Sequence, residues 1–283
     1  NGELVTALHG SVTADEFLGN LPNVGKMAVD TKVNVLGLGF WSKKMYWTLG
    51  VNANVSADMA LSTDVFKALK TLGNGRYDLG NTSLEANAYL DAYLGTSFRV
   101  HRNVNIGLKA KFLMGVATLD AKFNNLYAEV NPEDVSAIVD GTVNANGILF
   151  DSSVVEPGKE LPFAEMVKYN DVSYMLNNAK NFGFAFDVGT EVRLLNNHLI
   201  ISAALTDFGF ITWKADNLIS AAVDGNFGFN GINLATQDME FEQDFEFVAT
   251  RPTAEDKYNT QLNFSVNAGV EYNFLRNHFA LGL

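Results

Sequence analysis

The sequence contains no cysteine, which excludes disulfide frameworks, thiolate zinc sites and cysteine nucleophiles. It also lacks a long apolar run. Although 47% of its residues are hydrophobic, the mean hydropathy is only +0.03, and no segment approaches the roughly 18 apolar residues that a membrane helix needs. Basic residues are scarce, because 20 Lys and Arg stand against 32 Asp and Glu. The net charge of -12 argues against a general binder of nucleic acid.

Proline is also rare, with 5 residues, whereas glycine (24) and phenylalanine (21) are frequent. This composition is rich in turn formers and aromatics and lacks the charge density of a disordered tail, so we expect an ordered chain. The 283 residues suffice for one large domain or two ordinary ones. The sequence starts at Asn1 without a Met or a signal peptide, so we interpret it as a processed product or a portion of a longer chain.

Alternation of apolar and polar residues is the strongest pattern that is present. It runs without interruption over residues 82–100 and resumes over residues 104–116, after a short turn at residues 101–103. This period of two predicts strands. Folding the pair about its turn places Phe98 opposite Ile106, so both apolar sets share one face.

The same hairpin pattern recurs along the chain, and about eight strands are expected in all. The face of the first strand is ambiguous, because Val33 and Val35 are out of phase with Leu36 and Leu38. The further alternating pairs are residues 33–41 with 47–55, 182–194 with 199–205, and 262–274 with 279–283.

Connections alternate between short and long. The turns at Ser42, His101, Asn196 and Arg276 take about three or four residues, whereas residues 58–81, 119–181 and 214–258 form long connections. We interpret the long ones as surface loops, with a short helix at residues 64–72 and extra β-structure at 142–150. This asymmetry is typical of an outer-membrane barrel, with short periplasmic turns and long extracellular loops.

We therefore predict an all-β fold, an antiparallel transmembrane β-barrel. The strands of a soluble sandwich or barrel also alternate between apolar and polar residues. A strand of 19 residues is, however, longer than the roughly ten residues that soluble strands usually reach. Residues 1–32 are predicted as an N-terminal loop segment and residues 33–283 as a single barrel domain. Because the last strand begins at Phe279 and ends at Leu283, we expect a barrel that is incomplete at this end, since about 9 to 11 residues are needed to cross a bilayer.

Three phrases carry a resemblance to a known family: LGLGFWSKKMYWTLGV, AYLGTSFRVHRNVNIGLKAKFLMGVATLDAK and LTDFGFITW. They resemble a Bacteroidetes family of outer-membrane proteins of unknown function. That family is similar in architecture to long-chain fatty-acid transporter-type barrels and to barrel subunits of secretion machinery. The resemblance implies a barrel of roughly 14 strands in the outer membrane of a Gram-negative bacterium, with roughly six strands beyond those present. It implies no catalytic residue.

The lumen is the candidate site, because charged residues fall on the polar face of the predicted strands. Asp91 lies diagonal to Lys111 in the predicted register, close enough for a cross-strand pair. The alternative is that balanced charges only satisfy one another in a wet interior. The predicted lumen-lining residues are Glu85, Asp91, Arg99, Lys109, Lys111, Asp187, Glu191, Arg193 and Glu271.

Other constellations offer little chemistry. His101, His198 and His278 fall in short turns, and nothing spaces them as metal ligands. The acids at 240, 242, 244 and 246 could bind a cation, although their spacing also fits the wet side of a loop strand. The segment GNFGFNG lacks the lysine of a phosphate cradle. We predict no catalytic, metal or cofactor site and no enzyme.

The predicted function is passage of small or hydrophobic molecules across the outer membrane. The alternative is a non-conducting structural or interaction subunit of a cell-surface or secretion complex. The expected partners are outer-membrane lipid and other surface or secretion proteins that contact the long loops.

Overall fold

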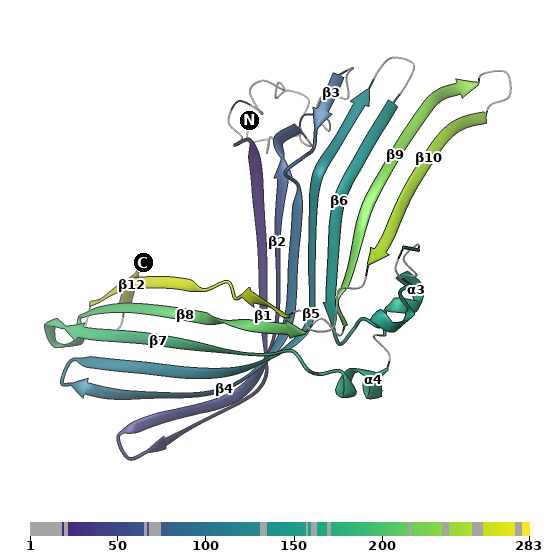
Figure 1. The fold of residues 1–283 in the computed structure, drawn as a ribbon. Coiled ribbons are helices and arrows are strands. Elements are labelled where there is room, and N and C mark those ends of the chain that lie inside the picture. The colour runs from purple at the N-terminus through teal and green to yellow at the C-terminus, as the bar shows by residue number, and fades with distance from the viewer. Residues whose placement is uncertain are drawn as a thin grey trace.

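The computed structural model describes residue 19 and residues 22–283, apart from 65–66, 68–74, 131–134, 157, 160–162, 169–170, 215–216, 234–237, 251–256 and 275–278. Within these residues, thirteen strands form one antiparallel sheet. The sheet curls into a half-barrel (Figure 1), which confirms the predicted all-β class. No helix in this part of the chain is long and apolar enough to span a membrane.

Eight of the described strands follow one another across the sheet, and they correspond to the alternating runs of the sequence. Phe98 pairs with Ile106 and Leu94 with Ala110, which confirms the predicted register. In sheet order they are β1 (Val24–Ser42), β2 (Met45–Ser62), β4 (Ser83–His101), β5 (Val104–Val130), β7 (Phe182–Leu194), β8 (Leu199–Lys214), β12 (Ser265–Phe274) and β13 (Phe279–Gly282).

Three of the four short turns lie at one end of the sheet, and the ends of β12 and β13 that flank the fourth lie there as well. The pairs Met45 with Phe98, Val104 with Val192 and Leu199 with Tyr272 bring neighbouring hairpin ends to the same level. Figure 1 shows these ends together at the left. We call this side the turn end. The predicted grouping of the short turns is therefore confirmed, although residues 275–278 of the fourth turn lie outside the described part.

At the opposite end, the prediction of surface loops is largely wrong, because the long connections contain strands. β5 has 27 residues, and it pairs with β7 near the turn end but with β6 from Ala117 onward. The sheet therefore divides along β5. The additional strands are β3 (Gly75–Asp78), β6 (Val135–Gly147), β9 (Ile219–Asn233), β10 (Asp238–Thr250) and β11 (Lys257–Gln261).

Short helices occur in the connection from β6 to β7. They are η1 (Ser152–Val154), α3 (Phe163–Met166) and α4 (Val172–Asn177). Val155 and Met166 from this connection pack on Ile219 of β9, so the connection covers the base of the β6–β9 part. Most of the helix predicted at residues 64–72 lies outside the described residues.

A β-bulge resolves the ambiguous phase of the first strand. Asn34 pairs with Asn52 and Leu36 with Val51, so Val35 is an extra residue in β1. A bulge shifts the alternation by one residue, which places Val33 and Leu36 on the same face although their spacing is odd. β1 also begins at Val24, so the predicted boundary at residue 33 is wrong by nine residues, because the altered phase conceals the first half of the strand.

Two more bulges lie in β5 and in the pairing of β7 with β8. Val116 is the extra residue of β5 opposite β4, and the pairing of β7 with β8 shifts between Phe186 and Val188. Bulges bend a strand and increase its twist. They account for the sharp curvature of the long strands between the turn end and the opposite end (Figure 1).

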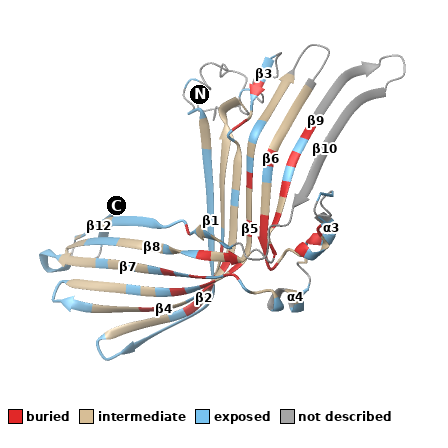
Figure 2. Ribbon diagram, viewed as in Figure 1, coloured by how far each residue is buried: buried red, intermediate tan, exposed pale blue. Residues whose placement is uncertain are grey.

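The two faces of the curved sheet differ in polarity. On the convex face, a row of paired residues runs from Phe40 and Trp47 through Leu108 and Val188 to Val266. Many of these side chains are exposed, Val266 by 75%. Figure 2 shows little burial on the strands toward the turn end.

The concave face contains a buried apolar cluster midway along the strands. Leu113 and Trp213 are completely buried, and Ile211 is nearly so. They pack with Tyr89, Ala185 and Leu262. We call this group the inner core. It fills the inside of the curl next to the bulges.

The sheet is open within the described residues. β1 pairs only with β2, and β13 pairs with residues 271–274 of β12. A small closed barrel with β1 against β12 therefore does not form in this part of the chain, as the sequence predicts.

Gly115 leaves the space that Trp213 occupies, because a Cβ at position 115 would lie 2.7 Å from Cη2 of Trp213. We expect Gly115→Ala to lower the free energy of unfolding by about 1–3 kcal/mol through overpacking. The control is Gly107→Ala in the same strand, where a Cβ meets no atom within 4 Å, and we expect a change of at most about 0.5 kcal/mol. Urea unfolding followed by tryptophan fluorescence measures both. Equal effects would contradict the packing role of Gly115.

Candidate functional site

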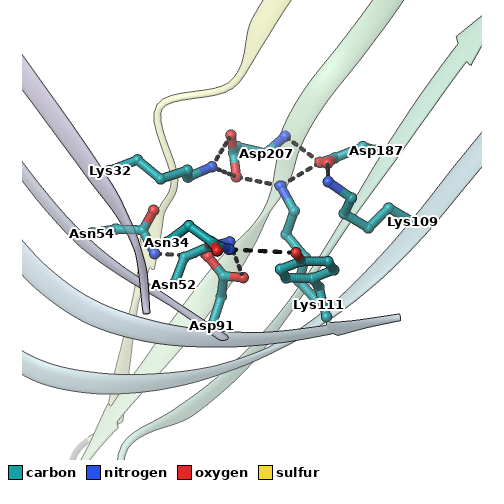
Figure 3. Close-up of polar contacts among 10 residues, drawn as sticks. Lys32, Asn34, Asn52, Asn54, Asp91, Lys109, Lys111, Asp187 and Asp207 are labelled. Atoms are coloured by element: carbon teal, nitrogen blue, oxygen red, sulfur yellow. Dashed lines mark hydrogen bonds and ion pairs between the residues drawn. The ribbon is translucent and has the colours of Figure 1, made fainter. Parts of the chain in front are cut away.

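A buried ion triad lies on the concave face beside the inner core (Figure 3). The Lys111 Nζ is 2.6 Å from Oδ1 of Asp187 and 2.6 Å from Oδ1 of Asp207, and the lysine side chain is only 2% exposed. The three residues come from β5, β7 and β8. A buried charge is tolerated when it is paired and hydrogen-bonded, so the lysine holds three neighbouring strands together.

The bulge of β8 positions Asp207. Its backbone has a φ of 59°, in the left-handed region that Asp adopts more readily than most residues. The backbone N–H of Asp207 donates to Oδ1 of Asp187 at 2.8 Å. The bulge therefore turns the carboxylate toward Lys111 and also ties the two aspartates to each other.

A lysine from the edge of the sheet completes the charge network. The Lys32 Nζ of β1 is 3.2 Å from Oδ2 of Asp207, and the Lys109 Nζ is 3.8 Å from Oδ2 of Asp187. β1 and β8 are separated by β2, β4, β5 and β7 in the sheet, so the contact between Lys32 and Asp207 crosses the hollow of the half-barrel.

Asp91 is completely buried beside this network, but its partners differ from the prediction. The side chains of Asn52 and Asn54 donate to its two carboxylate oxygens at 2.9 and 2.7 Å. The predicted diagonal register is correct, since Tyr93 pairs with Lys111. The predicted ion pair between Asp91 and Lys111 is wrong, because the ammonium group of Lys111 pairs with Asp187 and Asp207 instead.

We call the whole group the waist cluster. It has three lysines and three aspartates, so its formal charge is zero. It lies beside the inner core, and residues of both groups line a cavity of about 200 Å³. Its members are Lys32, Asn34, Asn52, Asn54, Asp91, Lys109, Lys111, Asp187 and Asp207.

Three other predicted lumen residues gather near the turn end. The Arg193 Nε donates to Oε1 of Glu191 at 2.6 Å, and the side chain of Asn105 donates to the same oxygen at 3.2 Å. The Arg99 Nε donates to Oδ1 of Asn105 at 3.5 Å. These contacts link β4, β5 and β7.

The two remaining predicted residues lie apart from both groups. Glu85 is 3.6 Å from the Nζ of Lys122, and the side chain of Asn273 donates to Glu271 at 2.8 Å.

Between the waist cluster and the turn end, the concave side is hollow. The hollow has a volume of about 800 Å³, and small residues such as Gly107, Gly189 and Ala204 leave it open. Trp41 lies on its wall and contacts Tyr46, with ring centroids 5.1 Å apart. We call this hollow the cup.

Sequence reasoning missed Lys32, Asp207 and Trp213. Lys32 and Asp207 each lie close to a bulge, and a bulge breaks the alternation from which the face of a side chain is predicted. Trp213 was not assigned to the inner face because the run after Leu205 changes phase. The phrase TDFGF, in which a polar pair interrupts an alternating run, was the only signal of the bulge.

Of the histidine candidates that the structure describes, neither His101 nor His198 lines the cup. The His198 Nδ1 lies 2.8 Å from the carbonyl oxygen of Asn273 in the turn region. Among the described residues, no three His, Asp or Glu side chains are grouped as a metal site. The acids at 240–246 fall in β10, and their side chains lie outside the described part. The segment GNFGFNG belongs to β9, not to a loop.

Comparison with known proteins gives one match. Residues 1–283 match a family that is described as a family of unknown function, DUF5723. No curated protein and no solved structure matches the chain.

Lys111→Met tests the triad, because it keeps the length of the side chain and leaves two largely buried carboxylates, 15% and 19% exposed, without their shared cation. We expect a loss of about 3–5 kcal/mol in the free energy of unfolding. The control is Lys122→Met, which removes the ion pairs of an exposed lysine (55%) with Glu85 and Asp120, and there we expect at most about 1 kcal/mol. Denaturant titration of both variants measures these changes in the free energy of unfolding. A loss for Lys111→Met no larger than the control would contradict the role of the triad.

Proposed function

We propose that this chain, which belongs to the family of unknown function DUF5723, forms part of the wall of an outer-membrane β-barrel in a Gram-negative bacterium. In this proposal the barrel passes small or hydrophobic molecules, and its short turns face the periplasm. The likeness to Bacteroidetes barrels of roughly 14 strands is part of the same proposal.

The distribution of polarity is the observation that carries the membrane setting. Large apolar side chains are exposed on the convex face, among them Phe184 (62%) and Val266 (75%), whereas the ion triad lies inside the curl. Soluble proteins rarely expose apolar patches of such extent. A lipid-facing apolar band around a polar interior is the arrangement of outer-membrane barrels.

The cup supports passage of a small ligand. Its volume of about 800 Å³ is within the range of pockets that hold drug-sized ligands. The waist cluster closes its inner end, and the contact of Lys32 with Asp207 is the most exposed part of the closure, with the lysine side chain 43% exposed. Separation of β1 from β8 at this contact would open the way past the waist.

The packed waist also favours a second function, a non-conducting structural or interaction subunit. Asp91, Leu113 and Trp213 have no exposed surface, so the parts of the waist cluster and the inner core that they form are tightly packed. In this alternative the β6–β9–β10 part would contact surface or secretion proteins. We propose no enzymatic activity for either function.

Val266 and Asn267 provide a matched pair for the membrane setting, because both are exposed on β12 and they face opposite sides of the sheet. We expect Val266→Arg to oppose insertion by up to about 2–4 kcal/mol, the value near a bilayer midplane. Asn267→Arg should have little effect, since it faces the concave side. Folding into lipid vesicles, scored by protease protection, measures both. Equal sensitivity would indicate a soluble protein.

A crosslink across the waist tests passage. The chain has no natural cysteine, so Lys32→Cys combined with Asp207→Cys offers a unique pair for a short bis-maleimide. In cells that express the full-length protein, we expect faster uptake of the hydrophobic dye 1-N-phenylnaphthylamine, and crosslinking should reduce it. The same double variant without crosslinker is the control, because it has lost the same charges.

Two results decide between the functions. Uptake that exceeds that of cells without the protein and falls on crosslinking supports passage through the waist. If there is no uptake and no conductance in planar bilayers, passage is refuted and the structural subunit becomes the better proposal.

A further inference from the structure

A second, strongly basic depression lies at the turn end. It has a volume of about 520 Å³, and its walls are formed by Arg99, Arg102 and Arg193 with the asparagines at 103, 105, 196 and 197. We call it the arginine basin. No acidic side chain contributes to its wall, in a chain whose net charge is -12.

Two neighbouring hairpins build the basin. Arg99 is near the end of β4 and Arg102 is in the turn that follows, while Arg193 is near the end of β7. The asparagines at 196 and 197 have φ values of 57° and 69°, so this tight turn holds their side chains beside the arginines. The pairing of β5 with β7 fixes the two hairpins against each other.

Most of the positive charge in the basin is unpaired. Glu191 engages Arg193 through Nε, which leaves the two terminal nitrogens of that guanidinium free of a carboxylate in the described part. Within the described residues, the hydrogen-bond partner of the Arg99 side chain is the amide oxygen of Asn105. Among the described residues, no carboxylate pairs with Arg99 or Arg102. The basin therefore presents an excess of donors and positive charge.

The arginine basin is continuous with the cup, because Arg99, Asn105 and Arg193 line both. The cup adds Trp41 and small residues such as Gly189 and Ala203. A molecule at this place would therefore meet guanidinium groups at the mouth and an aromatic, largely small-residue wall deeper inside.

We propose that the arginine basin binds the phosphate group of an amphiphile whose apolar part lies in the cup. Guanidinium groups bind phosphate with paired hydrogen bonds. One arginine fork suffices for a planar carboxylate, whereas donors from several directions suit a tetrahedral phosphate. Here the donors come from three strands, β4, β5 and β7, and from two turns.

This inference goes beyond the proposed function, since binding at the mouth of the cup requires no passage through the waist. It can fail while passage is confirmed, and it can hold for a barrel that conducts nothing.

Calorimetric titration of the full chain, folded in uncharged detergent, tests the proposal. The probes are dihexanoyl phosphatidylglycerol, inorganic phosphate, dihexanoylglycerol and decanoate. We expect the phospholipid to bind more tightly than the other three, because it alone joins a phosphate to an apolar part. Binding of the phospholipid should also change the fluorescence in a Trp47→Phe background, where Trp41 is the exposed one of the two remaining tryptophans.

The test variant is Arg99→Gln combined with Arg102→Gln, for which we expect the phospholipid affinity to fall at least about tenfold. The control is Arg76→Gln combined with Lys159→Gln, which removes two positive charges elsewhere. Arg76 stacks on Tyr127 in the β3 region, and Lys159 pairs with Glu156 after η1. The control should keep the wild-type affinity, and the unfolding midpoint should show that both variants are folded.

Each remaining outcome overturns a defined part of the proposal. Equal affinity for phosphate and phospholipid would show that the cup does not contribute to binding and that the basin is a site for free phosphate. Equal affinity for decanoate and phospholipid would overturn the preference for phosphate. Equal loss in both double variants, or in neither, would overturn the assignment to the arginine basin.

Discussion

The ion triad of Lys111, Asp187 and Asp207 is the interaction on which the curl of the sheet depends. Removing an ammonium group from water costs several kcal/mol, and only paired carboxylates at close range offset that cost. The geometry that supplies two of them requires β5, β7 and β8 to bend toward one another. Lys32 then approaches Asp207 from β1 at 3.2 Å, so the same carboxylate also determines how closely the edge strand approaches across the hollow.

The bulges allow this cluster and the apolar convex face to coexist. In strict alternation, a residue that is displaced by one position changes face. The extra residue in β1 shifts the phase between Lys32 and Leu36, and the irregularity in β8 does the same around Asp207. Polar side chains from both strands therefore converge inside the curl, while Leu36 and Phe208 stay outside. In the proposed membrane setting, the same change of phase keeps the lipid-facing band continuous across the bend.

The alternation allowed the main path of the sheet to be predicted from the sequence. The hairpin register of Phe98 with Ile106 follows from the turn length and the apolar pattern, and both are local properties. The strands within the long connections were mostly missed, because at that end of the sheet a single strand, β5, exchanges its neighbour β7 for β6. A change of partner far along the chain leaves no mark in the local pattern. The start of β1 was placed nine residues too late, because the bulge at Val35 breaks the alternation near the predicted start.

The candidate site, like the fold, could be predicted from the sequence only in part. The sequence by itself determined that Lys109, Lys111 and Asp187 lie on the polar face, because a period of two assigns every second side chain to one side. Only the tertiary structure decided that Lys111 pairs with Asp207, that Asp91 accepts from Asn52 and Asn54, and that Trp213 fills the space beside Gly115. These contacts join residues up to 98 positions apart, and they form only when the bulged strands curl. The face on which a side chain lies is determined within one strand, whereas the residues that it contacts across the hollow depend on the curvature of the whole sheet.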